Sequence, residues 1–170
     1  MTLYEDTKDL HHACEQHPVG KSMVDGSITP QAWADWLWAM RVLHLVVDSS
    51  VPAHMVRDAA FAADLSTLPK ARPSKVALWF ASDLVGENCG GAAYVLHGAH
   101  RSGGRVIAPK MTKRGLPTAH VCYRLPDEAK EWLGAARERQ DWAPQAQDTF
   151  QRLLGVMGEI HERIEYEART

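Results

Sequence analysis

The chain has 170 residues, with 19 Lys and Arg against 21 Asp and Glu, a net charge of -2, and 45% hydrophobic residues. This length predicts one domain or two small ones, large enough to fold without a disulfide or structural metal. The charge balance excludes the usual electrostatic nucleic-acid binder, and no apolar run reaches the roughly 20 residues of a membrane span. The three cysteines form no CxxC pair, and the first residues do not resemble a signal peptide. We therefore expect a cytoplasmic, reduced, monomeric protein that binds neither nucleic acid nor a membrane.

Proline, glycine and capping residues divide the chain into predicted helices. Thr29-Pro30, for example, is an N-cap followed by a proline at the first helical position. After it, apolar residues recur at spacings of three and four, the pattern of an amphipathic helix. The tryptophans at 33, 36 and 79 fall on apolar faces and are expected in the core. The predicted helices cover residues 6–16, 18–26, 30–47, 52–63, 74–86, 90–108, 126–139 and 144 onward.

Proline 109 is expected to end the helix over 90–108, because a proline removes a backbone donor and clashes with the preceding turn. No alternating strand pattern and no internal repeat occur in the sequence. We therefore predict an all-α fold of seven to eight helices, with residues 1–170 forming a single domain.

The segment from Tyr94 to Ile107 combines a helical pattern with an unusual number of glycines. Each glycine inside a helix costs about 0.5 to 1 kcal/mol relative to alanine. Glycine also lets the backbone approach another surface and lets a helix bend. The segment is a candidate cover over a planar ligand, and close helix packing through small residues is the alternative. Three glycines lie in this segment, Gly98, Gly103 and Gly104, and two more, Gly90 and Gly91, precede it on the same predicted helix over 90–108.

A second candidate site lies on the first predicted helix, around His11. Glu15 follows His11 by four residues and therefore shares its face, and Lys8 precedes it by three. A histidine in an apolar groove can ligate iron through one ring nitrogen while the other is oriented by a hydrogen bond. The alternatives are an ordinary surface helix with a His–Glu pair, and a two-metal carboxylate site. The second lacks its paired Glu-x-x-His spacing.

Together these two segments resemble the heme oxygenase family, in its soluble, biliverdin-producing, bacterial or phage-like type. Thr7-Lys8-Asp9-Leu10-His11, with Glu15 and the later Gly26-Ser27-Ile28-Thr29, resembles the family's proximal helix. The run from Tyr94 to Gly98, followed by Ser102-Gly103-Gly104-Arg105, resembles its glycine-rich distal helix. The two segments stand in the family's order about 90 residues apart, and the resemblance covers residues 5–110. It implies the heme oxygenase-like helical fold, with heme b between the two helices.

The resemblance assigns roles to individual residues. His11 matches the iron ligand, Glu15 its partner one turn later, and Lys8 a residue that contacts the heme propionates. Gly103 and Gly104 match the distal glycines that lie against the porphyrin and take part in catalysis, with Gly103 also binding the cofactor.

Three positions in the distal segment depart from the family pattern. Ala99, a cofactor-contacting position, stands where glycine is common, and Pro109 ends the helix early. His100 stands where many members carry an acidic residue that organises distal water. His100 can take over that catalytic role, ligate the iron and block it, or lie on the surface.

The resemblance also implies a reaction, the oxidative cleavage of heme to biliverdin, carbon monoxide and ferrous iron. Heme is then both cofactor and substrate, dioxygen is consumed, and a ferredoxin or a flavoprotein reductase supplies the electrons. Two other classes stay open: a heme carrier of the same fold without turnover, and a helical interaction module without heme. A basic stretch is a candidate docking face for the electron donor, with ordinary surface charge as the alternative: Arg101, Arg105, Lys110, Lys113 and Arg114.

Overall fold

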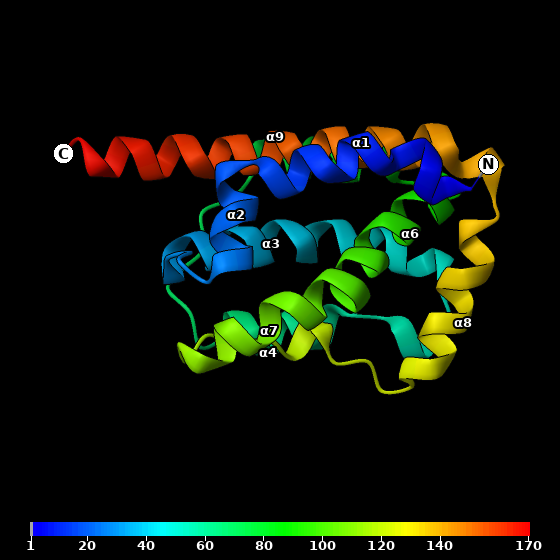
Figure 1. The fold of residues 1–170 in the computed structure, drawn as a ribbon, viewed down its shortest axis with the longest axis horizontal. Helices are drawn as coiled ribbons and strands as arrows, with labels where there is room; N and C mark the ends of the chain where they lie inside the picture. The colour runs from blue at the N-terminus through cyan, green and yellow to red at the C-terminus, as the bar shows by residue number, and fades with distance from the viewer. Residues whose placement is uncertain (1) are drawn as a thin grey trace.

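A computed structural model describes residues 2–170, and these residues form helices and connecting loops without a strand. Figure 1 shows the helices stacked along one long axis, with the two chain ends at opposite ends of it. The elements are α1 (Leu3–Gln16), α2 (Pro18–Asp25), α3 (Pro30–Val47), η1 (Asp48–Ser50), η2 (Ala53–Met55), α4 (Asp58–Leu65), α5 (Lys75–Leu84), α6 (Gly90–Gly98), η3 (Ala99–Gly103), α7 (Gly104–Lys113), η4 (Ala119–Val121), α8 (Pro126–Arg137), η5 (Gln140–Trp142) and α9 (Ala143–Ala168). The prediction of an all-α fold is confirmed.

Side-chain caps begin the helices that position the site. The Thr29 hydroxyl accepts a hydrogen bond from the Ala32 amide at 3.2 Å, and Pro30 occupies the first turn of α3. Ser74 caps α5 in the same way, through the Ala77 amide at 3.0 Å. Both starts agree with the sequence prediction, because a capping side chain satisfies an amide that the helix itself leaves unpaired.

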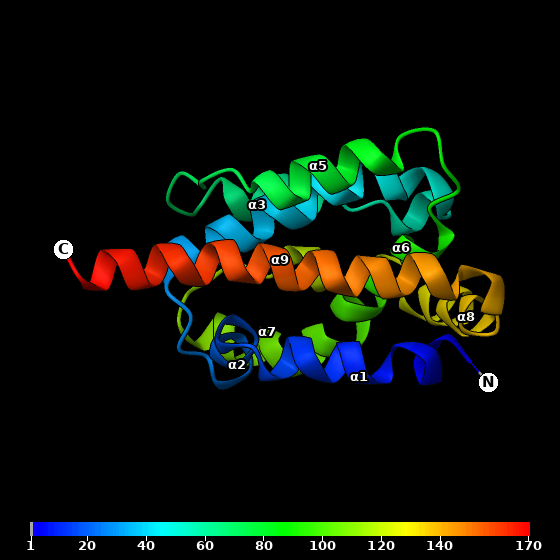
Figure 2. The same ribbon diagram turned by 90° about the horizontal axis from the view of Figure 1, so that it is seen from above.

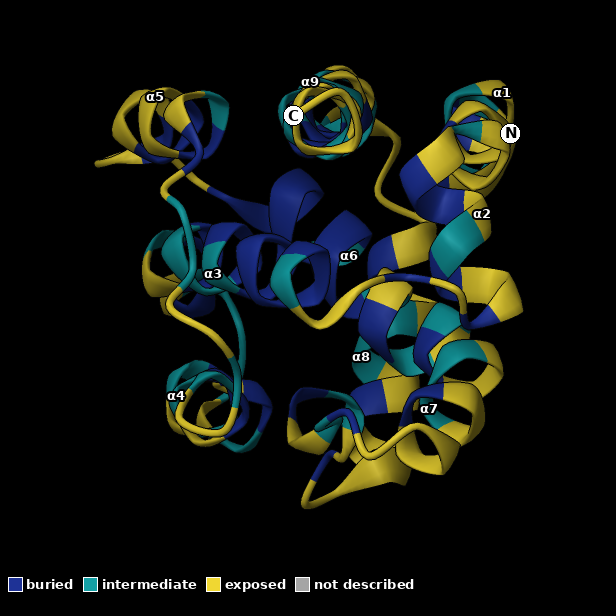
Figure 3. Ribbon diagram, turned by 90° about the vertical axis from the view of Figure 1, so that its left-hand side faces the viewer, coloured by how far each residue is buried: buried dark blue, intermediate teal, exposed yellow. Residues whose placement is uncertain are grey.

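The core is centred on α3 and α6. In Figure 3 these two helices lie in the middle and are dark blue over much of their length, with α1, α5 and α9 around them. Trp33 and Trp36 are buried as expected, but Trp79 is 64% exposed, so its predicted core position is wrong. Trp79 lies on the outer side of α5, whose buried residues are Ala77, Phe80, Ala81 and Leu84.

The longest helix, α9, crosses the whole molecule. Figure 2 shows it between α1 on one side and the α3–α5 pair on the other. It has 26 residues, yet no helix within residues 2–170 combines the length and apolarity that crossing a bilayer requires.

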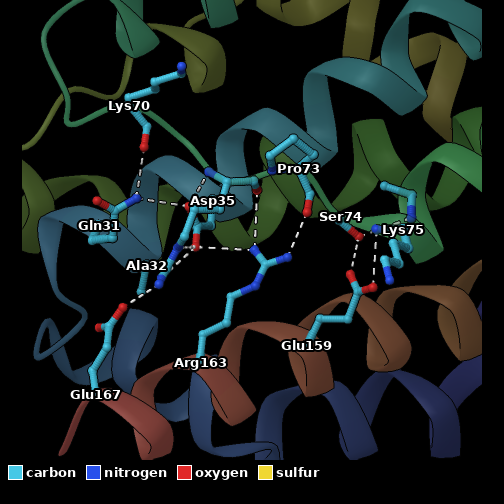
Figure 4. Close-up of polar contacts among 12 residues, drawn as sticks. Gln31, Ala32, Asp35, Lys70, Pro73, Ser74, Lys75, Glu159, Arg163 and Glu167 are labelled. Atoms are coloured by element: carbon cyan, nitrogen blue, oxygen red, sulfur yellow. Dashed lines mark hydrogen bonds and ion pairs between the residues drawn. The ribbon is translucent and has the colours of Figure 1, made fainter. Parts of the chain in front are cut away.

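A polar clamp ties α3, α5 and α9 together at one end of the core (Figure 4). The Asp35 carboxylate is 1% exposed and accepts from the Arg72 backbone at 2.7 Å and from its guanidinium at 2.8 Å. Arg163 of α9 reaches the same carboxylate at 3.4 Å and donates to the Pro73 carbonyl at 2.6 Å. Glu159 accepts from the Ser74 hydroxyl one turn earlier on α9. Because the buried Asp35 carboxylate is paired with Arg72 and Arg163, the clamp fixes α9 against α3 without leaving that charge unpaired.

Two expected helix boundaries are wrong. Pro109 lies inside α7, which continues to Lys113, because the next helix residues are held by other elements. Lys110 donates to the Val24 carbonyl, and Arg114 donates to two further carbonyls just after α2. The segment 52–63 forms η2 and then α4, separated by a short extended stretch. The number of helices agrees with the prediction when α6, η3 and α7 are taken as one continuous, π-interrupted helix.

Candidate functional site

A cavity of about 610 Å³ lies between α1 and α2 on one side and η3 and α7 on the other. This volume is within the usual range for small-molecule and cofactor sites, which are concave and largely apolar. The large apolar residues of the lining come from five elements, α2, α3, α7, η4 and α9: Met23, Val24, Trp33, Trp36, Val106, Ile107, Val121, Phe150, Leu153 and Met157. Such a lining suits a flat hydrophobic ligand.

His11 lines this cavity from α1. Its side chain is 47% exposed, and its ring meets the ring of Phe150 edge-on at 5.7 Å between centroids. The Glu15 carboxylate lies 3.7 Å from His11 Nδ1 and 3.7 Å from His12 Nδ1, too far for hydrogen bonds. The Glu15 side chain also lines the cavity. His11 therefore offers an accessible ring nitrogen whose ring is only loosely held.

Cys14 lines the same wall and is the rival ligand for a metal there. Burial, followed by the Glu15 charge, raises the pKa of the Cys14 thiol to about 12. Since the thiolate is the form that ligates metals, Cys14 stays a neutral thiol near neutral pH. On this wall, His11 is the better donor.

The opposite wall is the predicted glycine-rich segment. Ala99, His100, Gly103 and Gly104 all line the cavity, and the π-helical turn η3 runs from Ala99 to Gly103. A π-turn inside a helix is rare and frequently marks a functional site. The sequence predicted that this helix could bend at its glycines, and the break takes this π-helical form.

The two distal glycines have different surroundings. A Cβ built on Gly103 would meet nothing within 4 Å, whereas one on Gly104 would lie 2.6 Å from Val121 Cγ1. Gly104 is therefore required by close packing against η4, the alternative that the sequence left open. Gly103 lines the cavity and has no such packing reason among residues 2–170.

Lys8 is exposed and lines neither this cavity nor its neighbour. The neighbouring cavity, of about 520 Å³, shares His11, Ala99 and Phe150 with the first. No carboxylate lines it, and its four cations are Arg101, Arg105, Lys130 and Arg137. The Nε atom of Arg101 is buried without a hydrogen-bond partner in the described part of the chain. An unpaired buried donor among cations indicates a place for an anionic group.

The basic stretch predicted from the sequence separates into two parts. Lys110 and Arg114 donate to backbone carbonyls at Val24, Gly26 and Ile28, so they hold the end of α2. Arg101 and Arg105 line the second cavity. Only Lys113 has neither of these two roles.

Sequence reasoning missed a buried histidine network behind the distal wall. His100 is 5% exposed, and its Nε2 lies 2.9 Å from Nε2 of His44 on α3. His44 Nδ1 and His97 Nε2 approach the same Asp48 oxygen, at 2.8 Å and 2.9 Å. The surface position considered for His100 is therefore wrong. The available signal was the polar His44 inside an otherwise apolar helix face, together with nine histidines in one chain.

A second Asp–His pair stands beside this network. His120 is 2% exposed and lines the cavity, and its Nδ1 lies 2.6 Å from the Asp64 carboxylate. The same carboxylate accepts the backbone amides of Ala119 and His120 at 2.8 Å and 2.9 Å. The His100 and His120 rings meet edge-on at 5.3 Å, so two histidines form this part of the wall.

Comparison with solved structures decides the fold. A heme oxygenase from Leptospira interrogans superposes with a TM-score of 0.75 at 17% identity, covering 92% of this chain and 97% of its own. The chain has the heme oxygenase fold. The heme complex of heme oxygenase-1 from the cyanobacterium Synechocystis gives a TM-score of 0.74 at 13% identity, covering 98% of this chain and 95% of its own. No family model and no curated protein sequence matches the chain.

The shared fold confirms the predicted heme oxygenase-like helical fold. The roles of Lys8, His11, Glu15, Ala99, His100, Gly103 and Gly104 stay predictions. The structure brings six of these seven residues to one cavity and leaves Lys8 outside it.

Proposed function

We propose that this chain is a heme oxygenase, which binds heme between α1 and the α6–η3–α7 helix and opens its ring oxidatively. One observation carries the proposal: His11 and the unobstructed Gly103 line the same apolar cavity from two different elements. A cavity that pairs an accessible imidazole with a wall lacking a side chain fits a flat ligand with a metal at its centre. The fold likeness to two heme oxygenases supports the same reading.

The residues present fit heme b. His11 would hold the iron through one ring nitrogen. The Glu15 carboxylate lies near Nδ1 and would accept a hydrogen bond from it once the ring is oriented by the metal. The apolar lining would exclude water from the faces of the macrocycle. Bound heme supplies the site for dioxygen and is itself the molecule that is oxidised. A neutral histidine ligand suits this chemistry, because a thiolate favours O–O cleavage instead.

The distal wall would control what lies beside the ligand. Gly103 leaves open space, and Ala99 adds only a methyl group, so backbone there can approach the ligand closely. His100 and His120 are the imidazole side chains of this wall. They are placed to orient water and hold protons that the reaction consumes.

The heme carboxylates would lie toward the second cavity. Its cations, and the unpartnered Arg101 Nε in particular, match two carboxylates at the edge of an otherwise apolar ligand. Lys8 would contribute only from the exposed rim. This assigns the stronger propionate contact to Arg101 rather than to Lys8.

Electrons would come from a ferredoxin or a flavoprotein reductase. The sequence contains no flavin or iron–sulfur motif, and the exposed cations near the second cavity offer a face for an acidic donor. The products would be biliverdin, carbon monoxide and ferrous iron.

Absorbance spectroscopy tests the proposal. Hemin added to the purified chain should give a Soret band that saturates at one equivalent. With reductant and dioxygen, that band should disappear as biliverdin absorbance and carbon monoxide appear. A stable Soret band without product would make the chain a heme carrier, and no Soret band at all would make it a helical module without heme.

A further inference from the structure

In the buried histidine network, the contacts determine which ring nitrogens donate hydrogen bonds and which accept them. Four of its groups come from α3, η1, α6 and η3, and each is at most 9% exposed: His44, Asp48, His97 and His100. Tyr123 completes it, with its hydroxyl 2.7 Å from His97 Nδ1. The other Asp48 oxygen accepts the Arg57 amide at 2.7 Å.

The Asp48 carboxylate is the fixed point of the network. Burial alone would raise the pKa of Asp48, but the hydrogen bonds from His44 and His97 outweigh it and hold that pKa below its ordinary value. Asp48 is therefore ionised and can only accept hydrogen bonds. Each ring nitrogen that meets it, His44 Nδ1 and His97 Nε2, must carry a hydrogen.

The tautomer of His100 follows from that of His44. Burial, opposed by the Asp48 hydrogen bond, lowers the pKa of His44 to about 4, so the ring is neutral near pH 7. With its hydrogen on Nδ1, His44 has a lone pair on Nε2, and His100 Nε2, 2.9 Å away, must donate to it. Burial, reinforced by the neighbouring rings of His44, His120 and His97, also holds the pKa of His100 well below its ordinary value. His100 is then neutral, with a lone pair on Nδ1.

The lone pair on His100 Nδ1 has no partner in the described protein. His100 Nδ1 makes no hydrogen bond within residues 2–170, and it is not among the buried unpartnered atoms, which belong to His54, Arg72 and Arg101. The atom is therefore accessible, and the ring lines the 610 Å³ cavity.

We propose that Asp48, acting through His44, is a positioning residue that makes His100 a hydrogen-bond acceptor toward the cavity. This inference rests on the proposed function, because it is bound heme that gives the acceptor a role there. A water that donates one hydrogen to His100 Nδ1 keeps its second hydrogen to donate toward the ligand. His100 then does what a carboxylate would do at this position, while remaining uncharged.

A metal site is the competing interpretation of the same residues. His44, Asp48 and His97 offer ligand atoms within 4.8 Å of one another. A metal there would have to displace the hydrogens of two bonds that are already 2.8 Å and 2.9 Å long. The hydrogen-bond network satisfies every one of these atoms without an ion, so we favour it.

Nitrogen-resolved NMR of the heme-free chain with ¹⁵N-labelled histidine reads the tautomers directly. We expect His100 to be protonated on Nε2 and unprotonated on Nδ1, and His44 to show the reverse. The opposite pattern for His100 in the unmodified protein overturns the proposal. A joint shift of the His44 and His97 resonances on addition of one equivalent of Zn²⁺ also overturns it, because the site then binds a metal.

Asp48→Asn should invert the network. The Arg57 amide still needs an acceptor, so the new amide oxygen should take that side and the NH2 group should face His44 Nδ1. His44 would then carry its hydrogen on Nε2 and donate to His100, which would show Nδ1–H to the cavity. An Asp48→Asn protein that folds and keeps the original tautomers overturns the proposal.

Tyr123→Phe is the matched control. It removes a hydrogen bond at the far end of the network and should leave the His44 and His100 tautomers unchanged. Hemin binding, from Soret titration, should stay similar in both variants. Product formation should fall about 10-fold or more in Asp48→Asn, as expected when a proton-handling group loses its orientation.

The two proposals fail in different ways. If the unmodified chain binds no hemin, the proposed function fails while the NMR result stands on its own. If hemin is turned over but His100 carries its hydrogen on Nδ1, the proposed role of Asp48 fails and the proposed function survives.

Discussion

The two walls of the cavity hold their histidines in opposite ways. On α1, His11 is 47% exposed and its nearest carboxylate oxygen, on Glu15, is 3.7 Å away. On η3, His100 is 5% exposed and bonded at 2.9 Å to a ring that is itself bonded to a buried carboxylate. An iron ligand must bring a free nitrogen to the metal, whereas a group that orients water must keep one tautomer. The difference between the walls therefore matches two different tasks.

The glycines of the distal wall provide the largest expected effect. Gly103→Leu should place a side chain in the open space beside the ligand, and turnover should fall by about 100-fold or more. The free energy of unfolding should stay the same or rise by up to about 1 kcal/mol, since leucine is a better helix former than glycine. Hemin turnover and urea unfolding of the same sample measure both effects.

Gly104→Ala is the control that separates an effect on turnover from an effect on stability. Its Cβ would stand 2.6 Å from Val121, so the variant should lose about 1–3 kcal/mol of stability through overpacking. If Gly103→Leu turns over hemin at the unmodified rate, the distal wall is not where we place it.

The stability of the protein should also depend on pH through the buried His44. The pKa of His44 is about 4 in the folded chain against 6.5 when unfolded, because burial disfavours its charged form. Between pH 6.5 and 4 the unfolded chain therefore binds the extra proton, so stability is complete above about 6.5 and falls as the pH is lowered. The shift corresponds to about 3 kcal/mol.

Urea unfolding at several pH values measures this loss. His12→Ala, which changes an exposed histidine on α1, should show the same decline as the unmodified chain. A free energy of unfolding that stays constant from pH 7 to 5 would contradict a neutral, buried His44.

The carboxylate contacts give the smallest expected effects. Arg101→Met should weaken hemin binding by roughly 10-fold, the value of one hydrogen bond to a charged group. Lys8→Ala should weaken it by no more than about 5-fold, because an exposed pair contributes about 0–1 kcal/mol. Lys8→Ala is also expected to change which meso carbon is attacked if it lets the heme rotate. A larger loss for Lys8 than for Arg101, in parallel Soret titrations, would reverse our assignment of the propionates.

Much of the fold could be predicted from the sequence. Capping residues such as Thr29 and Ser74 act locally, so the helices that they begin are visible in the sequence. The helix end at Pro109 could not be predicted correctly, because the contacts that stabilise α7 beyond this proline involve residues about 85 positions earlier, near the end of α2. The exposure of Trp79 could not be predicted either, because the sequence pattern does not determine whether an apolar residue near the edge of a helix face is buried.

The site was predicted only in part, for a related reason. His11 and Gly103 could be found because they lie in segments with a recognisable pattern. The Asp48 network could not, since its members are up to 79 residues apart, and only folding brings His44 and His97 to one carboxylate and Tyr123 to His97. The two cavities are also products of packing, so the cations that line the second cavity, on which we base our proposal for the propionates, were not visible in the sequence.

The most direct test of the central claim, that α1 supplies the iron ligand and η3 does not, is the coordination of ferric hemin in three proteins. Electron paramagnetic resonance and resonance Raman spectra of the unmodified chain, His11→Ala and His100→Ala should be compared at equal hemin saturation. The account predicts that His11→Ala alone loses the axial histidine nitrogen and regains it with added imidazole, while His100→Ala keeps it. Loss of that nitrogen, or a change from low to high spin, in His100→Ala with His11→Ala unaffected would contradict it.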